Sequence, residues 1–315
     1  MAEVKKQATR EAYGAGLVEL GAEYDNLLVL DADLAAATKT GAFKKAYPDR
    51  FFDCGIAEGN MMSIAAGLAT TGKIVFASSF AMFAAGRAFE QVRNSIGYPH
   101  LNVKIGATHA GISVGEDGAT HQCCEDIALM RTIPGMTILN PADGREAVAA
   151  MRAAVEMQGP VYLRFGRLAV PVVTPDEPFV IGKGQTLRDG ADVTIIATGL
   201  MVNEALIAAD TLAEEGINAR VINMATIKPI DRDIIVKAAA ETGAIVTAEE
   251  HTVIGGLGSA VAEVVAETKP VPVVRVGVED TFGQSGPAVD LLKIYGLSAE
   301  NIVNKAKAAL TLKNA

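Results

Sequence analysis

Residues 52–93 have the sequence FDCGIAEGNMMSIAAGLATTGKIVFASSFAMFAAGRAFEQVR. Extended and helical segments alternate along it. Residues 51–54 and 73–77 are rich in strand formers, whereas 60–71 and 81–96 have the spacing of helices. This alternation predicts parallel strands that are covered by helices.

Glu58 stands at the start of the nearly chargeless helix at 60–71. A helix N-terminus accepts a carboxylate, because its first N–H groups are free and the helix dipole favours negative charge. A helix this apolar, however, is expected to be buried. A buried carboxyl group should have a raised pKa and needs a partner, and no basic residue lies within one turn of Glu58. Glu58 is therefore a candidate functional residue.

The composition of the 315 residues narrows the class of protein. Half the residues are hydrophobic, and 28 basic against 37 acidic residues give a net charge of −9, which argues against a nucleic-acid partner. With no apolar run long enough for a membrane span and a polar start, we expect a cytoplasmic protein. Cys54, Cys123 and Cys124 fit neither a disulfide framework nor a metal motif, and no metal site is predicted.

The length suits two α/β domains, each with a mostly parallel sheet and helices on both faces. Prolines and glycines gather at 168–190. We therefore expect a first domain at 1–168, a linker at 169–190 and a second domain at 191–315. Further strands are expected at 26–31, 101–107, 136–139, 161–164, 192–197, 219–223, 244–248 and 272–277, and further helices at 8–22, 123–131, 143–157, 201–215, 231–241 and 257–267.

Polar residues gather where two of the expected strands end. THAGISVGEDGATHQ (108–122) follows one strand, and DADLA (31–35) closes another. Ligands bind at the carboxyl ends of parallel strands, so both segments are candidates for function. The glycines of GGLG (255–258) precede a helix and could hold an anion. Because Glu249, Glu250 and His251 fill the spacing to the preceding strand, a tight packing turn is the preferred interpretation.

Taken together, the motifs resemble the C-terminal half of transketolase over essentially the whole chain. The matching segments are DADLA (31–35), GIAEGNM (55–61), SSFAMF (78–83), THAGISVGEDGATHQ (108–122), GP…R (159–167) and EEHTVIGGLGSAVAE (249–263). The N-terminal half of a transketolase, which binds the diphosphate and Mg2+ through a GDG-type motif, has no counterpart here. The resemblance implies one subunit of a split transketolase whose separate N-terminal subunit carries that site, in an α2β2 assembly. The small-residue helix 60–71 is a candidate interface.

The resemblance also implies thiamine diphosphate as cofactor and assigns residues to it. Glu58 would share a proton with a ring nitrogen of the pyrimidine, which activates the cofactor. Phe80 and Phe83 would line the pyrimidine slot, with Phe83 stacking on the ring. Asp33 would lie near the cationic thiazolium.

For the substrates, the resemblance implies transfer of a two-carbon ketol unit between a ketose phosphate and an aldose phosphate. His109 and His121 would act at the reacting carbons, and Asp117 would bind a substrate hydroxyl. The sugar phosphate would be bound by Arg10, His109 and Arg167. Ala37 stands where the family often has a further phosphate-binding serine, which leaves the acceptor sugar open.

Three alternatives share the fold. Deoxyxylulose-phosphate synthase typically has arginine where His109 stands, and the β subunits of 2-oxoacid dehydrogenases lack the GEDGxTHQ string. The third alternative is a noncatalytic regulatory module. Burying polar groups such as Glu58 and His109 in a dry cleft costs free energy, and a module without catalytic function has no physical reason to keep them there. This argues against the third alternative.

Overall fold

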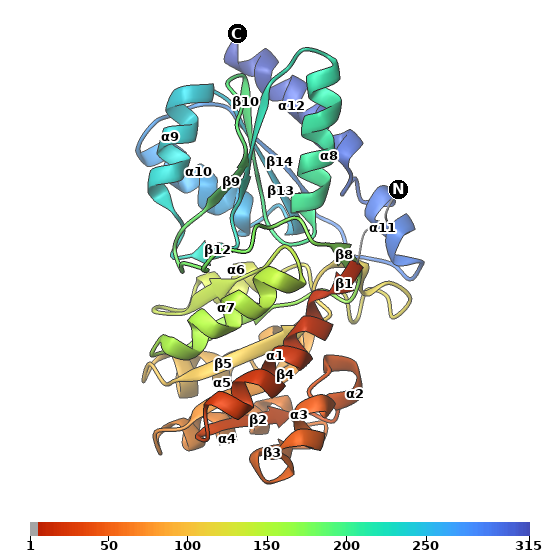
Figure 1. Cartoon of the computed structure of the whole chain (residues 1–315). Coiled ribbons are helices and arrows are strands. Elements are labelled where there is room, and N and C mark those ends of the chain that lie inside the picture. Colours follow the sequence, from red (N-terminus) through yellow and green to blue (C-terminus); the bar gives the residue numbers. More distant parts are fainter. Residues whose placement is uncertain (1–5) are drawn as a thin grey trace.

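A computed structural model describes residues 6–315, and these form two domains that lie one above the other (Figure 1). Residues coloured red to yellow-green form all but one strand of a seven-stranded sheet, and residues coloured green to blue form a five-stranded sheet. Helices cover both faces of each sheet, which confirms the predicted fold class. Within residues 6–315, no helix is long and apolar enough to cross a membrane.

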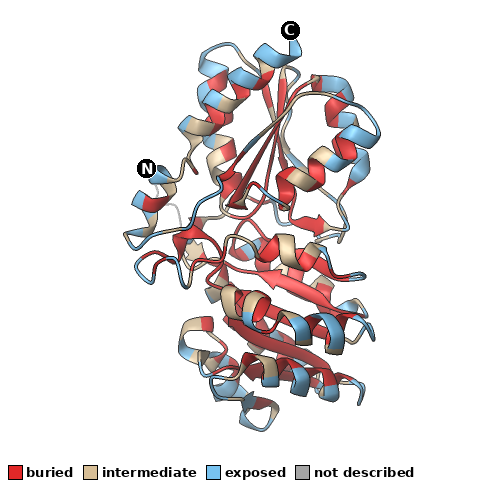
Figure 2. Cartoon of the chain, turned by 180° about the vertical axis from the view of Figure 1, so that it is seen from behind, coloured by how far each residue is buried: buried red, intermediate tan, exposed pale blue. Residues whose placement is uncertain are grey.

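The seven-stranded sheet has the order β12-β6-β7-β5-β4-β2-β3, and all its neighbours are parallel except β12 and β6. Its strands are nearly continuous apolar runs, as in parallel sheets that are buried on both faces. Figure 2 shows this burial along the strands. The bounds are β2 Leu27–Asp31, β3 Phe51–Asp53, β4 Ile74–Phe80, β5 Val103–Thr108, β6 Thr137–Leu139, β7 Val161–Arg164 and β12 Thr226–Lys228.

Alternating side chains of this sheet pack against different helices. Leu27 and Val29 of β2 belong to a core that includes side chains of α1 and α7, whereas Leu30 packs in a core with α4. The helical segments are α1 Thr9–Glu23, α2 Ala35–Thr38, α3 Gly41–Ala46, η1 Pro48–Arg50, α4 Glu58–Ala69, η2 Met82–Arg87, α5 Phe89–Gln91, η3 Val92–Gly97, η4 Ile112–Val114, α6 Asp126–Arg131 and α7 Gly144–Glu156.

The helix expected at 81–96 differs from the prediction in its internal geometry. Segments η2 and η3 are π-helical, with a short α-helical stretch, α5, between them. Each π turn holds one more residue than the α-helical spacing assumes, so the side chains after it turn to another face. Such turns are frequent at functional sites.

The five-stranded sheet has the order β14-β13-β10-β11-β9, in which β9 is antiparallel. Figure 1 shows α8 and α12 on one face and α9 and α10 on the other. The bounds are β9 Gln185–Arg188, β10 Val193–Ala197, α8 Met201–Glu214, β11 Ala219–Asn223, α9 Arg232–Thr242, β13 Ile245–Thr252, α10 Leu257–Glu267, β14 Val273–Val278, α11 Ala288–Ile294 and α12 Ala299–Lys313.

The region between the two sheets holds more structure than the linker expected at 169–190. Strand β8 (Ala169–Pro171) pairs with β1 (Lys6–Ala8), and β9 belongs to the second sheet. Strand β12, from the second half of the chain, completes the first sheet. The boundaries 1–168, 169–190 and 191–315 therefore stay a prediction, and β12 of the predicted second domain belongs to the sheet of the first.

The glycine motif at 255–258 is a packing turn, as expected. The carboxylate of Glu249 accepts hydrogen bonds from the backbone N–H groups of Leu257 and Gly258, each at 2.7 Å. The chain's own acidic side chain therefore occupies the N-terminus of α10, where a bound anion would otherwise lie.

Candidate functional site

The register of the first sheet brings the predicted site residues to one edge. Asp31 at the end of β2 lies opposite Ser78, and Phe80 at the end of β4 lies opposite Thr108 at the end of β5. Because these strands are parallel, the loops that follow them leave the sheet on the same side. This is the side on which ligands bind in open α/β sheets.

Glu58 is the first residue of α4 and is 1% exposed. Its carboxylate accepts a hydrogen bond of 3.1 Å from Nη1 of Arg87, at the end of the π-helical turn η2. Glu58 thus has the partner that its burial requires. The sequence did not reveal it, because Arg87 lies 29 positions away.

Phe80 and Phe83 connect Arg87, the partner of Glu58, to the two histidines. Their rings are stacked, with centroids 5.9 Å apart. Phe80 also stacks on His109 at 3.8 Å, and His121 meets the ring of Phe83 edge-on at 5.3 Å. The guanidinium of Arg87 lies over the Phe83 ring, 4.6 Å from its centroid. Residues predicted from separate motifs therefore form one contiguous cluster.

His109 is held in one tautomer by its neighbours. Its Nε2 lies 3.0 Å from Nη1 of Arg10, and its Nδ1 lies 2.9 Å from the hydroxyl of Thr108. Arginine can only donate, so Nε2 accepts and the ring proton is on Nδ1. Burial, followed by the charges of Arg10, Arg167, Lys39 and His121, lowers the pKa of His109 to about 3. The imidazole is neutral near pH 7.

His109 is also backbone-strained, with φ at +55°. Residues other than glycine rarely adopt this left-handed conformation, and when they do they are often at functional sites.

The cations around His109 form a positively charged region. Arg10 donates to the carbonyl of Ala37 at 2.9 Å, and Arg167 donates to the carbonyl of Val114 and to Glu116. Burial and the nearby Arg167 lower the pKa of Arg10. Lys39 packs on the same helix as Arg10, because a Cβ added at Gly14 would lie 2.5 Å from the Lys39 side chain.

Lys39 was not among the residues predicted for the phosphate site. Its nearness to Arg10 follows from the packing of α1, although its position two residues after Ala37 in the same strand-end loop was a usable signal.

Asp33 and Asp117 are the predicted site residues that the structure does not tie to this cluster. Both are exposed, and neither side chain makes a hydrogen bond or ion pair within residues 6–315. Asp31 instead stabilises the loop that follows β2. Its carboxylate accepts hydrogen bonds from the backbone N–H of Leu34 and from the hydroxyls of Thr38 and Thr40, at 2.6–2.8 Å. His121 is half-buried, with Nδ1 2.9 Å from the Thr120 hydroxyl.

A cavity of about 770 Å3 adjoins this cluster. Its volume lies in the range of small-molecule sites. Met82, Phe83 and Arg87 line it from the first domain, and residues 279–283 line it from the second. The two domains therefore both border the region beside Glu58.

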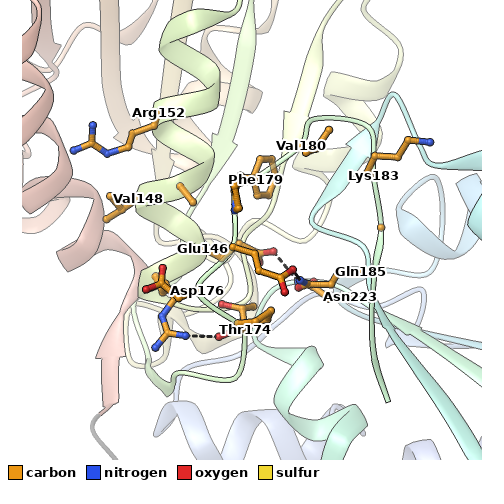
Figure 3. A pocket seen from close by; sticks show the side chains of 16 residues that line it. Glu146, Val148, Arg152, Thr174, Asp176, Phe179, Val180, Lys183, Gln185 and Asn223 are labelled. Atoms are coloured by element: carbon orange, nitrogen blue, oxygen red, sulfur yellow. Dashed lines mark hydrogen bonds between the residues drawn. The ribbon is translucent and has the colours of Figure 1, made fainter. Parts of the chain in front are cut away.

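A second cavity, of about 460 Å3, lies between α7 and the segment 174–185 (Figure 3). Glu146 of α7 and Asn223 of β11 meet there, with a hydrogen bond of 2.7 Å between them. None of the predicted site residues lines this cavity.

Comparisons with known proteins show the family of the chain. The family model "Transketolase, pyrimidine binding domain" matches residues 5–172, and "Transketolase, C-terminal domain" matches residues 182–302. The chain is 54% identical over 300 residues to a protein of Methanocaldococcus jannaschii named as a transketolase C-terminal section, covering 94% of each. It is 45% identical to a 6-deoxy-6-sulfo-D-fructose transketolase subunit of a Clostridium species, covering 97% of this chain and 95% of that one.

A solved structure named as a split gene transketolase, inactive β4 tetramer, shares 56% of the sequence with a TM-score of 0.90. The match covers 98% of this chain and 100% of the other. The family models together span nearly the whole sequence. The chain therefore belongs to the transketolase family, of which it holds the pyrimidine-binding and C-terminal domains.

Proposed function

We propose that this chain is the C-terminal subunit of a split, thiamine-diphosphate-dependent transketolase. It would take part in the transfer of a two-carbon ketol unit from a ketose phosphate to an aldose phosphate. The observation that carries the proposal is the cluster of Phe83, Phe80, His109 and His121, to which Arg87 links the buried Glu58. A cytoplasmic location stays our prediction.

The contacts of Arg87 support a fit of the cofactor's pyrimidine to this cluster. Its guanidinium is a flat cationic group that covers the Phe83 ring and donates an N–H to Glu58. A protonated aminopyrimidine presents the same two features, a flat face and an N–H donor. We therefore propose that Glu58 and Phe83 hold the pyrimidine, and that Arg87, which is exposed on its outer side, moves aside for it.

When bound, thiamine diphosphate supplies the nucleophilic carbon that carries the ketol unit. The chain's contribution to this chemistry is to hold a proton between Glu58 and the pyrimidine nitrogen in a site that excludes water. Asp33 would supply a carboxylate close to the thiazolium. Phe80, which is stacked between Phe83 and His109, fixes the distance from the pyrimidine slot to the substrate side.

On the substrate side, the neutral His109 and the half-buried His121 would bind or protonate oxygen atoms at the reacting carbons, and Asp117 would bind a hydroxyl. Arg10 and Arg167, with Lys39 beside them, form a cationic region that suits a phosphate. A sulfonate has a similar shape and also carries a negative charge, and a relative 45% identical is named for a sulfonated sugar. The exact sugars are therefore left open in the proposal.

The proposal includes a partner chain that binds the diphosphate and Mg2+. It is supported by the resemblance to the C-terminal half of a longer enzyme and by the similar chain that is named an inactive β4 tetramer. An α2β2 assembly would place the active site between subunits. Helix α4, which exposes Ser63, Ile64 and Gly67, is our candidate for part of that interface.

The experiment that tests the proposal is Glu58→Gln, assayed together with an N-terminal transketolase chain. We expect turnover to fall by about 10²- to 10⁴-fold, the usual range for a positioned acid or base, without a large change in melting temperature. Glu90→Gln, an exposed carboxyl of the neighbouring helix, is the matched control and should stay near wild type. Near-normal turnover of Glu58→Gln would exclude the assigned role.

A further inference from the structure

Three consecutive buried polar residues on β13, Glu249, Glu250 and His251, are not used in the proposed chemistry. Successive side chains of a strand point to opposite faces. Glu249 caps α10 within the second domain. Glu250 points the other way, toward the first domain. Its carboxylate accepts a hydrogen bond of 2.6 Å from the backbone N–H of Ser113.

Ser113 lies within the histidine loop, which we define as residues 108–122. The Glu250 carboxyl also packs directly on the backbone of this loop, since a Cβ added at Gly111 would lie 2.4 Å from it. Glycine is thus required at position 111 for two reasons. The φ of +83° is unfavourable for other residues, and a Cβ would collide with Glu250. The contact joins residues 137 positions apart.

Hydrogen bonds connect the middle of the histidine loop to its two ends, so a contact at Ser113 affects the position of both ends. Gly111 N–H donates to the carbonyl of Cys123 at 2.8 Å, which closes the base of the loop. The Gln122 amide donates across the loop to the carbonyls of Ile112 and Gly115, and to Gln284 of the second domain. His109 lies two residues before Gly111, and His121 directly precedes Gln122.

We propose that Glu250 of the C-terminal domain is a positioning residue, which holds the histidine loop in the conformation that brings His109 and His121 to the substrate. The inference rests on the proposed function. It gives the C-terminal domain a role in the reaction although that domain holds none of the predicted site residues.

The environment of Glu250 agrees with this role. The side chain is 4% exposed, and burial raises its pKa to about 7, while the nearby Arg164 lowers it. A carboxyl group buried this deeply is costly unless it is hydrogen-bonded. Its bond to Ser113 N–H is the side-chain hydrogen bond that the structure shows for it. Without the Glu250 side chain, the N–H of Ser113 would lose its hydrogen-bond acceptor, and the space beside Gly111 would be unfilled.

The test compares Glu250→Met with Glu249→Met. Methionine fills the space but accepts no strong hydrogen bond, and the two positions are equally buried neighbours on one strand. By hydrogen–deuterium exchange of this chain alone, we expect Glu250→Met to speed exchange about 10-fold or more in peptides covering 109–123 and to leave the start of α10 unchanged. Glu249→Met should show the reverse pattern.

In the two-chain enzyme, we expect Glu250→Met to lower kcat about 10- to 100-fold, the loss typical of misplaced reacting groups. Cofactor affinity should stay within about 3-fold. Glu250→Gln, which keeps an acceptor oxygen for Ser113 N–H, should restore most of the activity. If the methionine variant does not fold, Glu250→Ala serves the same comparison.

Two results would overturn the inference: unchanged exchange in 109–123, or equal losses of kcat in Glu249→Met and Glu250→Met. Failure of the proposed function itself would look different, because the unmutated chain would then be inactive with its partner while the exchange pattern still held.

Discussion

The buried ion pair between Arg164 and Asp126 allows a prediction of stability. Arg164 donates to Asp126 Oδ2 at 2.8 Å and to the carbonyls of Glu250 and Cys123 at 2.9 and 3.4 Å. Both side chains of the pair are almost wholly buried. In Arg164→Met, the carboxylate of Asp126 would keep one donor, the Tyr162 hydroxyl at 2.9 Å.

Removing one partner of a buried pair costs about 3–5 kcal/mol, because the remaining charge is left without compensation. Burial alone would raise the pKa of Asp126, but Arg164, and His251 after it, hold that pKa below its ordinary value. Without Arg164, the carboxyl would take up a proton in the folded state more readily than in the unfolded chain. The deficit in stability should therefore shrink as the pH is lowered from 7 to 5.

The assay is urea unfolding followed by circular dichroism at matched protein concentrations, because association changes apparent stability. Arg152→Met is the control: Arg152 also pairs with carboxylates, Glu19 and Glu23, but is 41% exposed. Such surface pairs contribute at most about 1 kcal/mol. A loss of stability in Arg164→Met that is no larger than the loss in Arg152→Met would contradict this prediction.

Two further predictions concern substrate binding and pH. Arg167→Ala should raise KM for phosphorylated sugars by about tenfold or more but leave KM for unphosphorylated sugars nearly unchanged, since a hydrogen bond to a charged group contributes about 1.5–3 kcal/mol; equal effects would remove Arg167 from the phosphate site. Burial raises the pKa of Glu146 from 4.5 to about 7, so the folded chain holds a proton between these values that the unfolded chain has lost. Wild-type stability should fall across that window by up to about 1.4 kcal/mol per pH unit more than the stability of Glu146→Gln, measured by urea unfolding; parallel curves would contradict this.

The fold was largely predictable, because its main signals are local. Strand β2 is an almost continuous apolar run that a polar loop follows, and β4 begins with such a run before its two serines. The three-residue strand β12 and the strand β9 carry no such signal. Each is defined by a partner strand distant in the sequence.

The geometry of the candidate site was predictable where a motif places its own residues, as for the burial of Glu58 at a helix start and the strand-end position of the histidine loop. What sequence reasoning missed depends on tertiary contacts. Arg87 reaches Glu58 through a π turn, whose extra residue cannot be read from an α-helical period. Lys39 comes to Arg10 by packing on α1. Glu250 meets Ser113 across the junction between domains.

The most direct test of the central claim is a transketolase assay with xylulose 5-phosphate, ribose 5-phosphate, thiamine diphosphate and Mg2+. It is run on this chain alone and on its mixture with an N-terminal transketolase chain. We expect activity in the mixture and none from this chain alone. Activity from this chain alone would contradict the split site, and a mixture that neither turns over sugars nor binds thiamine diphosphate would contradict the proposed function.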